Sequence, residues 1–306
     1  MGYIRFENIV KNFGSTQVLK NINLDIEKGQ LVTLLGPSGC GKSTLLRCLA
    51  GLETVTSGKI WLDGKEITNV EPRKRDIGMV FQQYSLFPNL TVEKNVAFGL
   101  QLKKMSKNQI DTKVKEMLEI VGLGDKGKNY PSQLSGGQQQ RAALARAIVT
   151  EPKVLLLDEP LSAIDALLRK SLQMEIRRIQ RETDITAIFV THDQNEAMVM
   201  SDMIHLLYDG KIEQSAEPAQ MYARPATKFA ASFIGSYNII SSEEFQKMTG
   251  TKAESETIAF RPESVKLSEE RPDETDSYVF RGKIVDGIPQ GNVYRYGIGC
   301  EGVRIH

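Results

Sequence analysis

The chain has 306 residues, of which 41% are hydrophobic, and its 39 Lys+Arg stand against 38 Asp+Glu. This length is typical of about two domains with cores of their own, and three cysteines are too few for a disulfide framework, which favours a reducing compartment. The formal net charge of +1 provides no basic field for a phosphate backbone, so we expect no nucleic-acid partner. No apolar run approaches the ~18 residues that a membrane-spanning helix needs, and the N-terminus lacks a signal-peptide pattern, so any membrane role should be peripheral.

Strand and helix patterns alternate along the first two thirds of the chain. Apolar runs at residues 22–26 and 31–35 predict short strands. From about residue 92 to residue 150 the apolar positions follow helical spacing, which predicts a helical insert. Strand-sized runs then resume around a charged helical stretch (166–182), at residues 154–157, 186–190 and 203–208. The alternation predicts an α/β fold with a parallel sheet and helices on both faces.

After about residue 235 the pattern changes to short strands between Gly and Pro residues. A polar stretch begins at Ser241, and the strands are predicted at residues 257–260, 278–285 and 293–298. Such spacing predicts a small β-barrel. We therefore expect two domains, residues 1–235 and residues 236–306.

A phosphate-binding loop follows the predicted strand at residues 31–35. Gly-Pro-Ser-Gly-Cys-Gly-Lys-Ser fits G-x-x-x-x-G-K-[ST] and precedes a helical segment, as this motif requires. Its backbone N–H groups would surround the β-phosphate, Lys42 would reach the β- and γ-phosphates, and the Ser43 hydroxyl would ligate Mg²⁺. The alternative is a glycine-rich turn without a ligand. The predicted nucleotide-binding residues are Gly36, Pro37, Ser38, Gly39, Cys40, Gly41, Lys42, Ser43 and Thr44.

Two carboxylates follow the buried strand predicted at residues 154–157. Ligands bind at the carboxyl ends of parallel strands, so Asp158 would hold Mg²⁺ through water and Glu159 would polarise the attacking water. In isolation, such a pair would more simply cap the next helix.

The segment Leu134-Ser135-Gly136-Gly137-Gln138 is identical to the signature motif of the ATP-binding subunits of ABC transporters. The sequence resembles these subunits over nearly its whole length. The resemblance implies a P-loop NTPase with a RecA-like core, a helical subdomain at about 92–150 and a C-terminal OB-like (TOBE) domain. In that family Ser135, Gly136, Gly137 and Gln138 would contact the γ-phosphate held by a second subunit. Two ATP molecules would then lie between the subunits of a homodimer.

The resemblance implies further site residues. Gln82 corresponds to the Q-loop glutamine, which contacts the metal or water, and Asp165 corresponds to the D-loop that crosses the dimer interface. His192 corresponds to the switch histidine that contacts the γ-phosphate. Phe13 occupies the position of the aromatic ring that stacks on adenine, with a core or strand-edge ring as the alternative.

Cys40 lies within the phosphate loop, next to a helix N-terminus. If the helix N-terminus lowers its pKa, ATP should protect the thiol from alkylation. The alternative is an inert, small side chain.

A chain without a membrane span cannot itself move a solute, and the family pairs such subunits with two transmembrane permease chains and, indirectly, an external solute-binding protein. We expect the chain at the cytoplasmic face of the membrane, docked through residues 83–98. An apolar cluster there, which could instead pack the helical insert, consists of Tyr84, Leu86, Phe87 and Pro88.

Phe260-Arg261-Pro262-Glu263 resembles an element of the regulatory domain in importers of polyamines, ferric iron, sulfate, phosphonates or maltose. Among these solutes, polyamine, ferric iron or phosphonate types are favoured. Relatives usually continue with more strands beyond residues 303–306, so we expect either a short barrel or an incomplete one.

Two other classes compete with an importer. A non-transport ABC ATPase acting on ribosomes or DNA usually has two fused cassettes or a long coiled-coil insertion, and this sequence has one signature motif and neither feature. A GTP switch or phosphotransferase could use the same phosphate loop. The signature motif and the absence of an Asn-Lys-x-Asp motif argue against that class.

Overall fold

The structure is a computed structural model that describes residues 2–306 apart from 82–84, 163, 165, 270–276 and 291–292. The chain divides into two units, Met1–Met221 and Tyr222–His306. Residue 235, the domain boundary expected from the sequence, lies in the second of these units, just after its helix α8 (Lys228–Phe233). Within the described residues, no helix is both long and apolar enough to cross a membrane.

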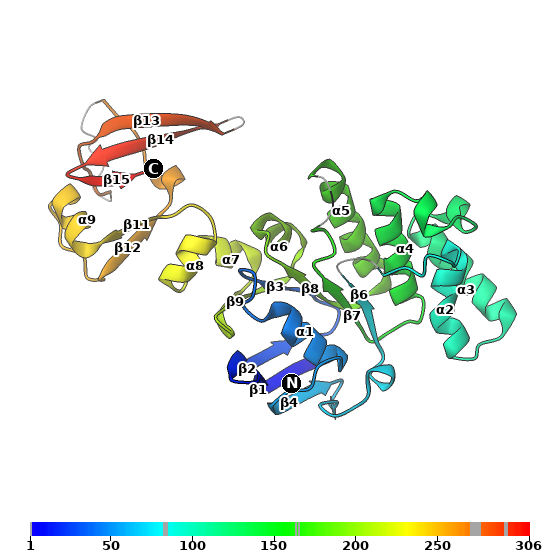
Figure 1. Ribbon diagram of the computed structural model, residues 1–306. Helices are drawn as coiled ribbons and strands as arrows, with labels where there is room; N and C mark the ends of the chain where they lie inside the picture. The colour runs from blue at the N-terminus through cyan, green and yellow to red at the C-terminus, as the bar shows by residue number, and fades with distance from the viewer. Residues whose placement is uncertain (1, 82–84, 163, 165, 270–276, 291–292) are drawn as a thin grey trace. The chain divides into compact units, whose positions relative to one another are not determined.

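In the described part of the first unit, six strands form one sheet in the order β10-β9-β3-β8-β7-β6 (Figure 1). Five of them run parallel: β3 (Leu31–Leu35), β6 (Ile77–Val80), β7 (Val154–Asp158), β8 (Thr186–Thr191) and β9 (Met203–Tyr208). The apolar runs predict four of these strands but miss β6. The sixth strand, β10 (Lys211–Ala216), pairs antiparallel with β9. Every residue of β3, β7 and β8 is buried, which is typical of central parallel strands.

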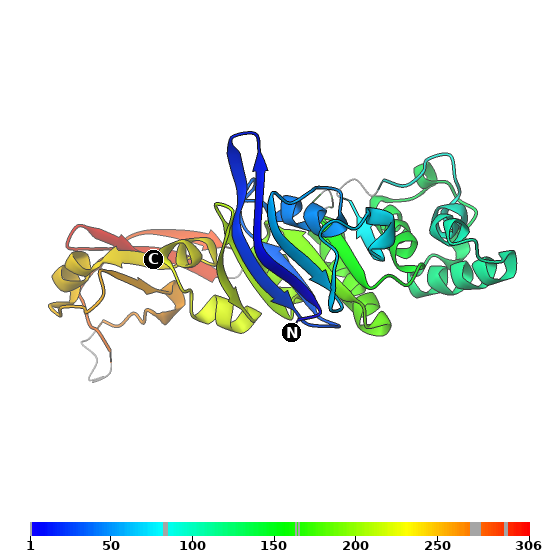
Figure 2. The same ribbon diagram turned by 90° about the horizontal axis from the view of Figure 1, so that it is seen from below.

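A second sheet is antiparallel and comes mostly from the start of the chain. Its order is β2-β1-β4-β5, and Figure 2 shows the long hairpin of its first two strands. The strands are β1 (Ile4–Phe13), β2 (Thr16–Ile26), β4 (Ser57–Leu62) and β5 (Lys65–Glu66). Helix α1 (Lys42–Ala50) follows β3 directly, and its apolar residues join those of this antiparallel sheet in one core cluster.

Alternate residues of the parallel strands enter different cores. Leu155 and Leu157 of β7 join the core formed with the helices after residue 92, whereas Leu156 joins the core around α1 and the antiparallel sheet. Helices therefore lie on both faces, as expected, but on one face α1 is accompanied by an antiparallel sheet that the sequence did not predict. The period-2 alternation was hidden because these strands are buried along their whole length and mostly apolar.

The predicted helical insert contains three helices with the caps that its sequence encodes. They are α2 (Val92–Leu102), α3 (Lys107–Ile120) and α4 (Gly136–Ile148), joined by the 3₁₀ turns η2 (Gly124–Lys126) and η3 (Pro131–Gln133). Thr91 caps α2, and Ser106 and Ser135 form capping boxes at α3 and α4. Three further elements complete this unit outside the insert: η1 (Pro72–Lys74), α5 (Ala166–Thr183) and α6 (Gln194–Met200).

The second unit contains two small antiparallel sheets, β11-β12 and β13-β14-β15, which fit an OB-like domain. Their strands are β11 (Asn238–Ser241), β12 (Thr257–Phe260), β13 (Lys283–Gln290), β14 (Val293–Cys300) and β15 (Val303–Ile305). Helix α7 (Pro218–Ala223) lies at the division of the units, and η4 (Pro262–Ser264) follows β12. Strand β13 begins at residue 283, not at 278. The polar stretch at Ser241 opens helix α9 (Ser242–Thr249), because Ser241 and Glu244 form a capping box.

Arg261, from the Arg-Pro-Glu element, organises the start of this unit. Its guanidinium carbon lies 3.2 Å from the ring centroid of Tyr222 and 4.2 Å from that of Tyr237. Arg261 Nε also donates to the Tyr237 hydroxyl at 3.0 Å, and the Tyr222 hydroxyl donates to Glu263 at 2.9 Å. The element thus holds three separate segments of the unit together.

His205 is a buried titratable group in the middle of β9. Its Nδ1 contacts Ser215 Oγ of β10 at 2.7 Å, while Nε2 is buried without a hydrogen-bond partner. Burial lowers the pKa of His205 to about 4, so the neutral imidazole is the form compatible with the fold.

We expect His205 to make the fold less stable in mild acid. Its contribution is fully present above the unfolded pKa of about 6.5 and is lost as the pH falls towards 4, by about 3 kcal/mol in total. In urea unfolding at pH 7, 6 and 5, His205→Leu should show a shallower loss of unfolding free energy than the wild type. Parallel pH profiles for the two proteins would contradict this assignment.

Candidate active site

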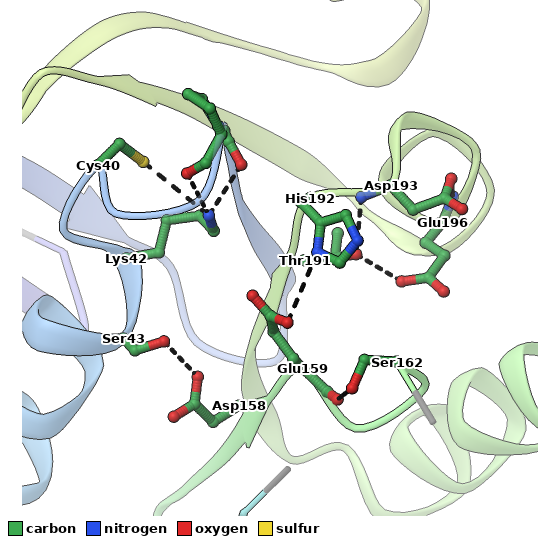
Figure 3. Close-up of polar contacts among 12 residues, drawn as sticks. Cys40, Lys42, Ser43, Asp158, Glu159, Ser162, Thr191, His192, Asp193 and Glu196 are labelled. Carbon is green, nitrogen blue, oxygen red and sulfur yellow. Dashed lines mark hydrogen bonds and ion pairs between the residues drawn. The ribbon is translucent and has the colours of Figure 1, made fainter. Parts of the chain in front are cut away.

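The predicted phosphate and carboxylate residues meet at the carboxyl edge of the parallel sheet. In the register of the strands, Leu35 pairs with Thr191, and Asp158 pairs with Val190. The segments that follow β3, β7 and β8 therefore begin side by side. Figure 3 shows side chains from all three segments around one space.

Lys42 is the first residue of α1, and its side chain is almost fully buried in the phosphate loop. Nζ donates to the carbonyl oxygens of Gly36 and Pro37, each at 2.8 Å. A buried ammonium needs such acceptors, and phosphate oxygens are stronger ones. The Lys42 head group therefore lies where a phosphate could replace loop carbonyls as its partner.

The glycines of the loop are required by its backbone path. Gly36 has φ +154°, and a Cβ there would lie 2.2 Å from the carbonyl oxygen of Leu207. Gly41, the N-cap of α1, has φ +106°, and its Cβ would lie 2.8 Å from Leu19 Cδ2. Gly39 has φ +79° but open space around its Cβ position. The loop can therefore turn its N–H groups inward only with glycine at these positions.

Ser43 and Asp158 form a contact between α1 and the end of β7. Ser43 Oγ donates to Asp158 Oδ1 at 2.7 Å, and Asp158 Oδ2 lies 3.9 Å from Arg47 Nη2. A hydroxyl and a carboxylate are hard oxygen ligands of the kind that Mg²⁺ takes together with phosphate oxygens and water. The two residues fit a Mg²⁺ ion.

Glu159 follows Asp158 in a strained backbone conformation and faces His192. Its φ is +46°, unusual for a residue with a side chain, and its carbonyl accepts from Ser162 Oγ at 3.0 Å. Glu159 Oε2 lies 3.5 Å from His192 Nδ1 (Figure 3). Strain of this kind is common at functional sites. The geometry brings the predicted base and the predicted switch histidine into contact.

The signature residues lie on a different part of the first unit, at the start of α4. Ser135 Oγ accepts from Gln138 N at 3.3 Å, and Gln138 Oε1 accepts from Ser135 N at 2.9 Å. Ser135 and Gly136 are exposed, whereas Gly137 is buried. Helix α4 packs on α2, α3 and β6, while α1 packs on β2, β7 and β8. Among the residues drawn together in Figure 3, none comes from the signature segment.

Three other predicted positions have different outcomes. Phe13 is the last residue of β1 and is 46% exposed, with Lys11 Nζ at 4.5 Å from its ring centroid. The ring is thus free to stack, although the alternative of a strand-edge residue is equally compatible with its place. Gln82 and Asp165 lie outside the described residues.

The expectation of an activated Cys40 thiol is wrong. Its side chain is buried, and burial raises the pKa of the thiol more than the neighbouring Lys42 lowers it. Adjacency to a helix N-terminus suggested the opposite direction, because the sequence did not reveal how deeply the loop covers this side chain.

Sequence reasoning missed four residues that surround His192. Thr191 Oγ1 donates to Glu196 Oε2 at 2.5 Å and accepts from the Asp193 N–H at 3.0 Å. Asp193 caps α6 and lies 3.5 Å from Arg169. The Asp-x-x-Glu pattern at residues 193–196 was a visible helix-start signal, but nothing in it indicated a bond to Thr191.

This fold and site define a P-loop nucleotide hydrolase of the ATP-binding cassette class. Residues 19–162 match the ABC transporter family. A dimeric structure of the ATP-binding cassette MJ0796, in a post-hydrolysis state with ADP and Pi, has a TM-score of 0.62 at 33% identity, covering 70% of this chain and 98% of its own.

Curated relatives show to which group within the ATP-binding cassette class the chain belongs. The spermidine/putrescine import ATP-binding protein PotA of Thermobifida fusca is 46% identical over 96% of this chain and 82% of its own. The sulfate/thiosulfate import ATP-binding protein CysA of Thermosynechococcus vestitus is 51% identical over 88% and 80%. The Fe(3+) ions import ATP-binding protein FbpC of Brucella abortus is 50% identical over 81% and 70%. The chain belongs to the ATP-binding subunits of ABC importers of the polyamine, sulfate and iron type, and it is an ATPase.

We expect Gly36→Ala to damage the phosphate loop far more than Gly39→Ala. Both substitutions place a side chain at positive φ, at a cost of about 1 kcal/mol, but only the first also forces a Cβ against the Leu207 carbonyl. Urea unfolding should therefore show Gly36→Ala to be less stable by about 2 kcal/mol more than Gly39→Ala. Equal losses would contradict the fixed approach of the loop to β9.

Proposed function

We propose that the chain hydrolyses Mg²⁺-ATP at the site formed by the phosphate loop, Asp158, Glu159 and His192. The observation that carries this proposal is the contact of 3.5 Å between Glu159 and His192, at the same sheet edge as the phosphate loop. Glu159 would orient and deprotonate the attacking water, and His192 would hold the γ-phosphate side of the site. Lys42 would bind the β- and γ-phosphates, and Phe13 would stack on the adenine.

Ser43 and Asp158 would hold Mg²⁺, with Gln82 as a further proposed contact. The ion supplies charge neutralisation between the phosphates when bound. The chain's own contribution is to keep the two oxygen ligands together: Ser43 Oγ and Asp158 Oδ1 are 2.7 Å apart across 115 residues of sequence.

We propose that two copies of the chain form a homodimer around two ATP molecules. Ser135, Gly136, Gly137 and Gln138 of each copy would complete the γ-phosphate site of the other, and Asp165 would lie at the interface. Support comes from the exposure of Ser135 and Gly136 at the N-terminus of α4, where N–H groups and the helix dipole favour an anion. The dimeric structure of the ATP-binding cassette MJ0796 with ADP and Pi supports a dimer.

The proposed docking surface for two permease subunits comprises residues 83–98, of which residue 83 and Tyr84 lie outside the described residues. Phe87 and Phe98 are each 36% exposed, and their ring centroids are 4.7 Å apart. Asn95 is fully buried beneath them and fixes the preceding loop, accepting from Phe87 N at 2.8 Å and donating to Leu90 O at 3.0 Å. Leu86 instead packs against the helical core, so the predicted apolar cluster is divided between docking and packing.

We propose that the complex lies at the cytoplasmic face of the membrane and takes up a solute delivered by an external binding protein. Polyamine, ferric iron or phosphonate types are the proposed solutes. The polyamine-import and iron-import relatives support the first two, and the sulfate-import relative supports sulfate as a further candidate.

Replacing the proposed base should stop turnover without stopping ATP binding. We expect Glu159→Gln to lower the ATP turnover rate by at least about 100-fold, because an amide cannot accept the proton of water. Glu151→Gln is the matched control, since Glu151 also has positive φ (51° against 46°) but lies on the surface. Wild-type turnover in Glu159→Gln would contradict the assignment of the base.

Replacing the signature serine should prevent dimer formation but leave ATP binding intact. In the Glu159→Gln background, Ser135→Arg should bind ATP as a monomer but show no ATP-dependent dimer by light scattering, because a bulky cation would occupy the helix N-terminus. Ser106→Arg is the control: Ser106 is likewise an exposed N-cap serine with a capping-box glutamine, at α3. A dimer in Ser135→Arg, or its loss in Ser106→Arg, would contradict the proposed interface.

A further inference from the structure

The loop that carries His192 is held by a short chain of hydrogen bonds. The Asp193 N–H donates to Thr191 Oγ1 at 3.0 Å, and the Thr191 hydroxyl donates to Glu196 Oε2 at 2.5 Å. Figure 3 shows the bonds from Asp193 to Thr191 and from Thr191 to Glu196 close to the His192 ring. Because both neighbours of His192 join the same chain, the backbone that aims the imidazole at Glu159 has little freedom.

Arg169 connects this loop to the segment that follows Glu159. Its Nη1 lies 3.5 Å from Asp193 Oδ2, and its Nη2 donates to the carbonyl of Ile164 at 2.9 Å. Its Nε is buried without a hydrogen-bond partner and lies 3.8 Å from Glu196 Oε1. The Arg169 side chain therefore links the segment that follows Glu159 to the loop that carries His192.

Glu196 is buried at the centre of these contacts, with only 5% of its surface exposed. Burial and the neighbouring Asp193 raise the pKa of its carboxyl, while Thr191, Arg169 and His192 lower it. A buried carboxyl that no substrate reaches is costly to retain unless its contacts hold something in place.

We propose that Thr191, Glu196 and Arg169 are positioning residues that fix His192 against Glu159 for ATP hydrolysis. In this role they act through the geometry of the loop and not by contact with nucleotide or water. The inference rests on the proposed roles of Glu159 and His192. Displacement of a catalytic group by about 1 Å can cost ~100-fold in rate, so loss of this support should lower turnover rather than binding.

The test uses the full chain with Mg²⁺-ATP and the isosteric change Thr191→Val, which removes only the hydroxyl. We expect kcat to fall by about tenfold or more, with the Kd for Mg²⁺-ATP within about twofold of the wild type. Thr191→Ser restores the hydroxyl and should recover most of the turnover. In a His192→Ala background, Thr191→Val should cause no further loss, because the threonine acts through the histidine.

Thr186→Val is the matched control, because Thr186 is a buried threonine at the opposite end of β8 whose Oγ1 accepts from Gly29 N at 2.9 Å. The Thr186→Val variant should lower the melting temperature, as we expect of Thr191→Val, but leave kcat unchanged. Equal kcat in the two variants, or an additive loss in the His192→Ala background, would overturn the positioning role. If Glu159→Gln and His192→Ala both retained full turnover, the proposed function itself would fail, which is a separate outcome.

Discussion

The parallel pairing of β3, β7 and β8 is the constraint on which the site depends. Leu35 pairs with Thr191, and Asp158 pairs with Val190, so the three strands end at one edge. A slip of one residue in β7 would turn Asp158 to the other face of the sheet, away from Ser43. Because all residues of these strands are buried, the register is fixed by packing on both faces, and the loops inherit their positions from it.

The charges buried at that edge of the sheet need nearby partners, which explains why the loops there are held by hydrogen bonds to charged side chains. Lys42 and Asp158 are 4% and 5% exposed, and each would be costly to bury without partners. The loop carbonyls satisfy Lys42, and Ser43 satisfies one oxygen of Asp158. These partners are neutral, and the charged Arg47 lies 3.9 Å from the other oxygen of Asp158, so the charges are compensated only in part. A polyphosphate with its cation is the kind of ligand that would complete the compensation at both groups at once.

The fold class and most of the site could be predicted because they are encoded locally. The phosphate loop lies between a strand and a helix, and apolar runs located β3, β7, β8 and β9 within a residue or so. What could not be predicted depends on contacts between distant segments. The burial of Cys40, the bond from Thr191 to Glu196 and the bridging by Arg169 arise only once the sheet brings their strands together. Likewise, the antiparallel sheet beside α1 depends on pairing between β1 and β4, which short-range patterns do not specify.

Family membership identifies this chain as an ATP-hydrolysing subunit but does not identify the transported solute. Relatives named for import of spermidine and putrescine, of sulfate and of Fe(3+) ions are 46%, 51% and 50% identical to this chain. Spermidine is a polycation and sulfate a dianion, so a solute contact in this chain would need opposite charges in these two relatives. This chain should be about equally identical to the spermidine and the sulfate relatives if the shared residues bind and hydrolyse ATP and the partner chains bind the solute. The differences between importers of this type should therefore lie at the docking surface proposed for the permease, around Phe87 and Phe98, rather than around Lys42 and Asp158.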